Sequence, residues 1–178
     1  RTRNGADTAR TRAFYQAVIE RVAAIPGVDR VSTTSGAPFD LSNSSTSLEV
    51  EGRLASGAAE SIEGEYRVAM PGYFETLGIP LLSGRTFGDA DRGGAPRAII
   101  VNATLARQGW PNEAAVGKRL RYDDEWHTVV GVVGDIKNAG LAAEPQAMFY
   151  VSALQDHWSS QRFVIRAAAR PEALAPAV

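Results

Sequence analysis

The chain is organised around the stretch VAMPGYFETLGIPLLSGRTF, which occupies residues 68–87. The pattern predicts the end of one strand, a helix of one or two turns, and a second strand. Pro71 suits the first helical turn, where its missing N–H is not needed. Gly78 suits the end of the helix, because glycine adopts positive φ without a Cβ clash.

Large apolar side chains fill this stretch. They lie on one side of the short helix and along the strand that follows, before Gly84 and Arg85 turn the chain. Each fully buried large side chain contributes about 1.5–3 kcal/mol to folding. We therefore expect a core-forming unit without reactive groups. Its apolar members are Tyr73, Phe74, Leu77, Ile79, Leu81, Leu82 and Phe87.

The composition is that of a globular domain, with 44% hydrophobic and 22% charged residues among 178. A net charge of −1 gives no electrostatic case for binding nucleic acid or an anionic membrane. The lack of cysteine excludes disulfides and thiolate metal sites but does not fix the compartment. No apolar run approaches the ~18–20 residues that span a bilayer. Because the chain starts at Arg1 without a signal peptide, we interpret it as a piece of a longer protein.

One amphipathic helix and several short strands are expected before residue 71. Residues 1–11 are polar and show no periodicity, which indicates a linker or a frayed terminus. Apolar residues then recur at helical spacing until Pro26 and Gly27, which predicts a helix that ends there. Its apolar face consists of Phe14, Val18, Val22 and Ile25. Strands are expected over residues 29–35, 47–52 and 62–70.

Two polar segments interrupt these strands. Residues 36–47 are rich in Ser, Asn and Pro and are expected to form a loop. This loop is either a recognition loop for a ligand or partner or, by default, an ordinary surface excursion. Residues 54–60, which contain Gly57 and several alanines, are expected to form a second loop.

After residue 87, short strands surround one further helix. A buried strand over residues 98–101 leads into this helix, which Asn102 or Thr104 caps. Residues 118–122 and 125–134 predict a hairpin joined by a two-residue acidic turn. Further strands are expected over residues 148–151 and 163–167, and a last helix over residues 171–178.

The sequence shows no catalytic or metal-binding constellation. Asp89 and Asp91 imitate two ligands of a calcium loop, but Ile100 stands where a bidentate Glu is required, so we expect an acidic turn. His127 and His157 are isolated, whereas a metal site needs three or four ligands, so packing or surface roles are expected. Neither a Gly-x-Ser-x-Gly elbow, nor a Walker A sequence, nor a dinucleotide fingerprint occurs. We therefore expect a non-enzymatic domain with no catalytic residue, no metal and no cofactor.

Several segments, taken in chain order, carry a resemblance to one family. Residues 70–87, MPGYFETLGIPLLSGRTF, resemble a signature of the MacB-type periplasmic core domain. That domain is the extracytoplasmic insert of FtsX-like ABC transporter permeases. Residues 98–106, AIIVNATLA, resemble its hydrophobic strand followed by an Asn-x-x-x-Ala helix. Further elements of the family are similar to Trp110-Pro111, to VGKRL at 116–120 and to VVGVVGDI at 129–136.

The resemblance implies an α+β fold with a mixed, largely antiparallel sheet and two lobes, which agrees with the order of the expected elements. A porter-like lobe would comprise residues 1–71 and 155–178, and an inserted, mostly-β sabre-like lobe would comprise residues 72–154. The family pattern also implies a strand before residue 1, and a helix and a strand after residue 178. The residues that carry over are structural: Pro71, Gly72, Tyr73, Phe74, Gly78 and Gly84.

The function implied by this resemblance is that of a non-catalytic domain of an ABC transporter permease. The domain would lie on the periplasmic side of the bacterial inner membrane, anchored by transmembrane helices outside this sequence. It would transmit motion from cytoplasmic ATP hydrolysis to substrate export or to partner proteins. The implied partners are a second copy of the permease, a separate or fused cytoplasmic ATPase, and a periplasmic adaptor protein.

Two other hypotheses stay open. An extracytoplasmic ligand-sensing module would bind a peptide or lipid between two lobes, with residues 36–47 as a lid, and its ligand would raise thermal stability. A hydrolase with an unfamiliar site would show ester or peptide cleavage that His127→Ala or His157→Ala abolishes. The transporter hypothesis requires an apolar helix of ~20 residues upstream and a cluster of three downstream in the parent reading frame. Polar flanks would favour a free-standing binding module.

Overall fold

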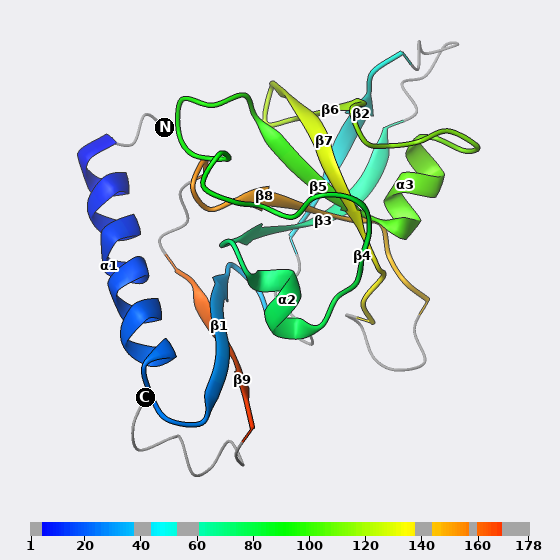
Figure 1. Cartoon of the computed structure of the whole chain (residues 1–178). Coiled ribbons are helices and arrows are strands. Elements are labelled where there is room, and N and C mark those ends of the chain that lie inside the picture. Colours follow the sequence, from blue (N-terminus) through cyan, green and yellow to red (C-terminus); the bar gives the residue numbers. More distant parts are fainter. Residues whose placement is uncertain (1–4, 38–43, 53–60, 138–143, 157–159, 169–178) are drawn as a thin grey trace.

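The structure is a computed structural model that describes residues 5–37, 44–52, 61–137, 144–156 and 160–168. Helices and strands alternate irregularly along the chain (Figure 1). The elements are α1 Gly5–Ala23, β1 Val28–Thr34, β2 Ser45–Val50, β3 Ile62–Ala69, α2 Tyr73–Leu77, β4 Leu81–Gly84, β5 Ala98–Asn102, α3 Ala103–Gly109, β6 Arg119–Tyr122, β7 Glu125–Val133, β8 Met148–Ser152 and β9 Arg162–Ala167.

Six of the described strands close into a hydrogen-bonded ring in the order β2-β6-β7-β5-β8-β3, and a pairing between β3 and β2 completes it. The pairs β3–β8 and β5–β7 are parallel, and all other pairings among the described strands are antiparallel. Closure matters because it satisfies strand edges that would otherwise be exposed. The predicted class, α+β with a mixed and largely antiparallel sheet, is confirmed.

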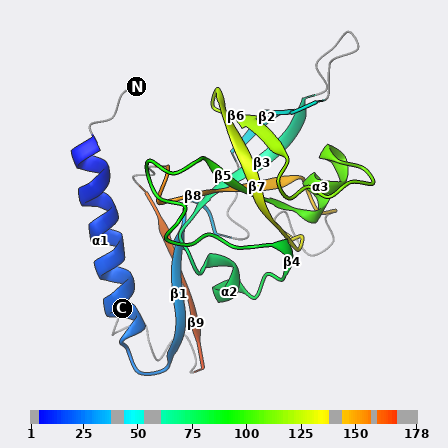
Figure 2. The same cartoon turned by 45° about the horizontal axis from the view of Figure 1, so that its top comes forward.

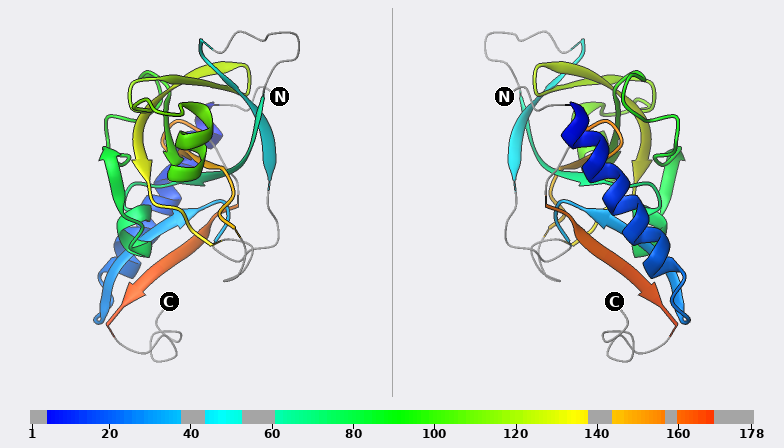
Figure 3. Two further views of the ribbon diagram at one scale, coloured as in Figure 1. Left: turned by 90° about the vertical axis from the view of Figure 1, so that its right-hand side faces the viewer. Right: turned by 90° about the vertical axis from the view of Figure 1, so that its left-hand side faces the viewer.

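Two long strands connect the ring to the remaining strands. The first half of β3 pairs with β2, and its last residue, Ala69, pairs with Thr34 of β1 on the same edge. The first half of β7 likewise pairs with β6, and its second half pairs with β4. Strand β1 then pairs with β9 over most of its length. We call β1 and β9 the ribbon; it projects from the ring, and α1 lies along it (Figures 1 and 3).

The alternation of side chains along β5 and β8 divides the core into two clusters. Ile99 and Val101 point into the ring cluster, whereas Ile100 between them joins the second cluster. Phe149 and Tyr150 divide in the same way on β8. Both strands are buried on both faces, because the ring core covers one face and the segment around α2 covers the other.

Helix α1 corrects two sequence-based expectations. It begins at Gly5, so most of residues 1–11 form helix rather than a linker. Phe14 was expected on the buried face but is 60% exposed. Instead, Tyr15 contacts Phe163 of the ribbon, and Ile19 packs against the ring core. Val22 of the expected face is buried as predicted, but Tyr15 takes the place of Phe14 because the ribbon lies beside the Tyr15 side of the helix.

Most of the predicted strands and turns are confirmed. The hairpin of β6 and β7 turns at Asp123 and Asp124, which both have positive φ, as tight hairpin turns require. Asn102, rather than Thr104, caps α3, since its side chain accepts a hydrogen bond from Leu105 N–H. The loop expected over 54–60, the helix expected over 171–178 and residues 38–43 of the loop expected over 36–47 lie outside the described residues. The expected bounds of that loop are wrong at its end, because β2 already begins at Ser45.

Two glycines allow β4 to lie against β7. An ideal Cβ added to Gly84 would lie 2.3 Å from the carbonyl oxygen of Val130. One added to Gly131 would lie 2.2 Å from the carbonyl oxygen of Arg85. Because both obstacles are backbone atoms, neither can yield without shifting a strand.

We predict that Gly84→Ala destabilises the protein by at least about 2 kcal/mol, since it combines a backbone clash with strain at φ 76°. The matched control is Gly52→Ala, which has φ 81° but no atom within 4 Å of the added Cβ. The control should cost only the strain, about 1 kcal/mol. Urea unfolding of both variants measures the difference, and equal losses would show that the close β4–β7 approach is not a constraint.

Candidate functional site

The predicted strand–helix–strand unit forms, and glycines bracket its helix. Gly72 is the N-cap of α2 with φ 85°, and Gly78 is the C-cap with φ 70°. The hydroxyl of Thr76 donates to the carbonyl of Gly72 over 2.7 Å and holds the first turn closed. The expected helix end at Gly78 is confirmed. The placement of Pro71 in the first turn is wrong, because Gly72 at positive φ separates it from the helix.

The buried side of α2 forms an aromatic cluster with the strands around it. Phe74 meets Tyr150 of β8 edge-on with ring centroids 4.8 Å apart, and it lies 6.3 Å from Phe87. Tyr73 lies 5.8 Å from the same Tyr150. All four rings are buried, and Val164 of β9 belongs to the same cluster. We call this cluster the α2 junction, because it joins the ring strand β8 to the ribbon. Helix α2 itself lies beside β1 (Figure 2).

The hydroxyls of the α2 junction are buried and stay protonated. Burial raises the pKa of Tyr73 to about 12, although the nearby Arg67 charge opposes the shift. Burial raises the pKa of Tyr150 further, well above its ordinary value. These tyrosines are therefore neutral at physiological pH, and their role in the junction is packing.

The expected burial of the strand after α2 is wrong in part. Ile79 and Phe87 are buried as predicted, but Leu81 is 44% and Leu82 is 56% exposed. The pairing of β4 with β7 shifts register between Leu81 and Ser83, which indicates a bulge at Leu82. Strand β4 pairs with the part of β7 that lies beyond β6, so these leucines do not face the ring core.

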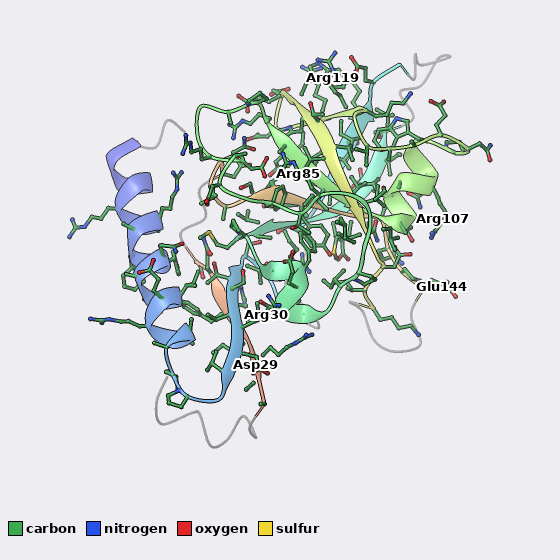
Figure 4. All side chains as sticks on the ribbon, viewed as in Figure 1. Asp29, Arg30, Arg85, Arg107, Arg119 and Glu144 are labelled. Atoms are coloured by element: carbon green, nitrogen blue, oxygen red, sulfur yellow. The ribbon has the colours of Figure 1, made fainter. Side chains whose placement is uncertain are left out.

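An ion pair between the half-exposed Arg85 and the buried Asp91 orders the acidic turn after Phe87. The carboxylate of Asp91 accepts two hydrogen bonds from Arg85, at 2.6 and 2.8 Å, and a third from Gly88 N–H at 3.0 Å (Arg85 is labelled in Figure 4). Burial would raise the pKa of Asp91, but the hydrogen bonds and charge of Arg85 and the Gly88 N–H outweigh it and lower the pKa. The sequence predicted an acidic turn here but gave no signal for its partner.

Asn102 does more than the cap that the sequence predicted. Its side-chain oxygen accepts hydrogen bonds from Leu105 N–H and Met148 N–H, each at 2.9 Å. Its side-chain nitrogen donates to the carbonyl of Gln146 over 2.8 Å. One fully buried amide thus fixes the start of α3 against the start of β8. The second role depends on a segment more than forty residues away, which local spacing does not reveal.

His127 has a packing role in the structure. His127 is 2% exposed, and its Nδ1 lies 3.0 Å from the carbonyl oxygen of Glu125. Burial lowers its pKa, and its ring lies beside Tyr122. Among the described residues, no group of three His, Asp or Glu side chains is placed to hold a metal ion. His157 lies outside the described residues.

The stem of the 36–47 segment is fastened to β3. Ser35 N–H donates to the carbonyl of Val68 over 2.9 Å, and Val68 N–H donates back to the Ser35 hydroxyl over 2.9 Å. Gly36 lies directly against Arg67, because an added Cβ would meet its Nε at 2.8 Å. The described stem is therefore fixed, and a recognition role for the rest of the segment stays a prediction.

Solved structures of transporter domains share this fold. The periplasmic region of MacB from Actinobacillus actinomycetemcomitans matches with a TM-score of 0.60 and 15% identity, covering 92% of this chain and 69% of that one. The extracellular domain of the ABC-type transporter YknZ from Gram-positive bacteria matches with a TM-score of 0.60 and 17% identity, covering 92% and 77%. A domain of a putative permease from Porphyromonas gingivalis matches with 0.55 and 20%, covering 90% and 71%.

These likenesses show that the chain shares the fold of extracytoplasmic transporter domains. The sequence profile of the MacB-like periplasmic core domain matches residues 2–178, so the chain belongs to that family. A search of curated proteins found no significant match. The resemblance inferred from the sequence motifs is thereby confirmed.

We predict that Phe74→Ala destabilises the protein by about 3–5 kcal/mol, since it opens a cavity in the α2 junction. Leu82→Ala should cost no more than about 0.5 kcal/mol, because Leu82 already faces solvent. Chemical unfolding of both variants tests this ranking. A loss at Leu82 comparable to that at Phe74 would mean that β4 is covered in the folded protein.

We further predict a pH-dependent role for Asp91. Its folded pKa lies below its ordinary 3.8, so the stabilisation is present above that value and is lost as pH falls through the folded pKa. Asp91→Asn should lose about 1 kcal/mol at neutral pH, a modest value because the Arg85 side chain is half exposed. The difference between wild type and variant should vanish in acid. A difference in unfolding free energy that stays constant down to about pH 2 would contradict this account.

Proposed function

We propose that this domain transmits motion from cytoplasmic ATP hydrolysis to substrate export or to partner proteins. Membership of the MacB-like family supports a place in an ABC transporter permease. The domain would act without catalysis, as a rigid body that the transporter displaces. The residues proposed to maintain this rigidity are Pro71, Gly72, Tyr73, Phe74, Gly78 and Gly84.

The observation that carries this proposal is the α2 junction. Helix α2 contacts both ribbon strands, while its aromatic side chains pack on β8 of the ring. A force applied to the ribbon would therefore reach the ring through close-packed aromatic side chains rather than through a linker. Close-packed protein interiors have low compressibility and transmit strain in this way.

The two-lobe division stays part of the proposal. Residues 1–71 with 155–178 would form a porter-like lobe, and residues 72–154 a sabre-like lobe. In the structure these segments meet in the parallel pairing of β3 with β8, from Glu65 and Met148 to Ala69 and Ser152, and in the antiparallel pairing of β2 with β6. Separation of the lobes would have to break both pairings.

The proposed partners follow from the transporter context. They are a second copy of the permease, a cytoplasmic ATPase that is separate or fused, and a periplasmic adaptor protein. The proposed location is the periplasmic side of the bacterial inner membrane, with anchoring by transmembrane segments elsewhere in the protein. Within the described part of the chain, no helix combines the length and apolar character needed to cross a bilayer.

The test uses the complete transporter, with a spin label at Gln108→Cys, an exposed position on α3. The chain contains no other cysteine, so labelling is specific within it. We predict that the distance distribution between the two copies differs between the nucleotide-free and ATP-trapped states. The control is a transporter whose ATPase is inactivated by mutation and which is not trapped with nucleotide. An identical distribution in both states would contradict mechanical transmission.

A further inference from the structure

Helix α1 is connected to the ring by one long-range side-chain hydrogen bond among the described residues. Nη2 of Arg12 donates to the carbonyl oxygen of Leu154 over 2.7 Å. The N-terminal half of α1 extends past β1, so the ribbon does not hold this part of the helix (Figures 1 and 2). Ile19, two turns further on, contacts the ring core. Arg12 is thus the polar attachment of the free half of α1.

The acceptor belongs to a tightly bonded turn. Residues 152–156 begin at Ser152, the last residue of β8, and the N–H groups of Gln155 and Asp156 both donate to the carbonyl of Ser152, at 2.9 and 2.8 Å. The Ser152 hydroxyl accepts from Leu154 N–H and donates to the carbonyl of Asp91 over 2.9 Å. Asp91 is the residue that Arg85 holds in place. We call residues 152–156 the anchor turn.

The anchor turn is fastened to the start of β5. The side-chain oxygen of Gln155 accepts from Ala98 N–H over 2.9 Å, and its side-chain nitrogen donates to the carbonyl of Pro96 over 2.8 Å. Nη1 of Arg97 donates to the carbonyl of Gln155 over 3.1 Å and lies 3.5 Å from the carboxylate of Asp156. A residue that binds the anchor turn is therefore also connected to the beginning of the ring strand β5.

Arg97 extends the connection to β7. Its Nε lies 2.6 Å from the carboxylate of Glu125, the first residue of that strand. One arginine thus joins the anchor turn, the start of β5 and the start of β7. A displacement of the anchor turn would be shared by two neighbouring strands of the ring.

The geometry of Arg12 favours a positioning role over a purely stabilising one. Its Nε is buried and has no hydrogen-bond partner among the described residues. A planar guanidinium that donates to a carbonyl fixes direction better than apolar contact does, because hydrogen bonds depend on angle.

We propose that Arg12 clamps α1 to the anchor turn, so that the helix and the ring move as one body. This inference rests on the proposed function, in which displacement of the domain is what the transporter uses. Without the clamp, the free half of α1 would swing relative to the ring, and displacement of the helix would be only partly passed on.

The test measures the distance within one chain between spin labels at Ala13→Cys, in the free half of α1, and Gln108→Cys on α3, both exposed positions. Labelled copies are diluted with unlabelled ones so that only distances within a chain are seen. Wild type should give one narrow distribution that nucleotide does not change. Arg12→Gln should broaden it, whereas Arg10→Gln, an exposed arginine on the same helix, should not.

Hydrogen exchange checks that a broadened distribution comes from the clamp and not from unfolding. Arg12→Gln should speed exchange of the Gln155 and Asp156 amides by about tenfold, as expected for loss of one hydrogen bond to a charged group. Amides of β5 beyond Ala98, such as Ile100, should be unchanged. Uniformly faster exchange would mean that the variant loosens the whole fold, which would overturn a specific clamp.

The outcomes separate this inference from the proposed function. Arg12→Gln with an unchanged distance distribution would overturn the clamp while leaving mechanical transmission intact. A nucleotide-dependent distance between positions 13 and 108 in the otherwise wild-type protein would also overturn it, since α1 and the ring would then move separately. If nucleotide left the distance between the Gln108→Cys labels of the two copies unchanged, the proposed function would be overturned. The comparison of Arg12→Gln with Arg10→Gln would still test the clamp.

Discussion

The rest of the structure depends on β3 pairing within the ring and with the ribbon at once. Its first half closes the ring by pairing with β2, and its last residue begins the ribbon by pairing with β1. Along the opposite edge it pairs in parallel with β8. Alternation then sends Val68 into the ring core and Ala69 into the cluster beneath α2. Neither core could form in its observed place without this strand.

The sequence predicted what local physics determines. Positive φ at Gly78, the cap at Asn102 and the turn of the β6–β7 hairpin all follow from residues within a few positions of one another. The errors concern contacts between distant segments. Phe14 and Leu82 have the spacing of buried residues, but their exposure is decided by where the ribbon and β7 lie. The partner of Asp91 and the second role of Asn102 were missed for the same reason.

In the candidate site, too, neighbouring residues revealed the local structure but not the contacts between distant segments. The motif of residues 70–87 identified the family and predicted the helix that forms the α2 junction. Both the family signature and the signals for the helix lie within this one continuous stretch. The other side of the junction, Tyr150 on β8 and Val164 on β9, lies far along the chain. The motif glycines and aromatics thus act on structure: they shape one turn of helix that fits between the ring and the ribbon. We propose that the transporter uses the rigid attachment of the ribbon to the ring to transmit displacement.

The central claim is that ring and ribbon form one cooperative body. Native-state hydrogen exchange under increasing denaturant measures this most directly. Amides in the ring strands β5 and β8 and amides in the ribbon pair β1 and β9 should exchange through the same global opening, with equal free energies. If the ribbon amides exchanged through a separate opening of much lower free energy, the α2 junction would not join the two parts, and rigid transmission through this domain would be contradicted.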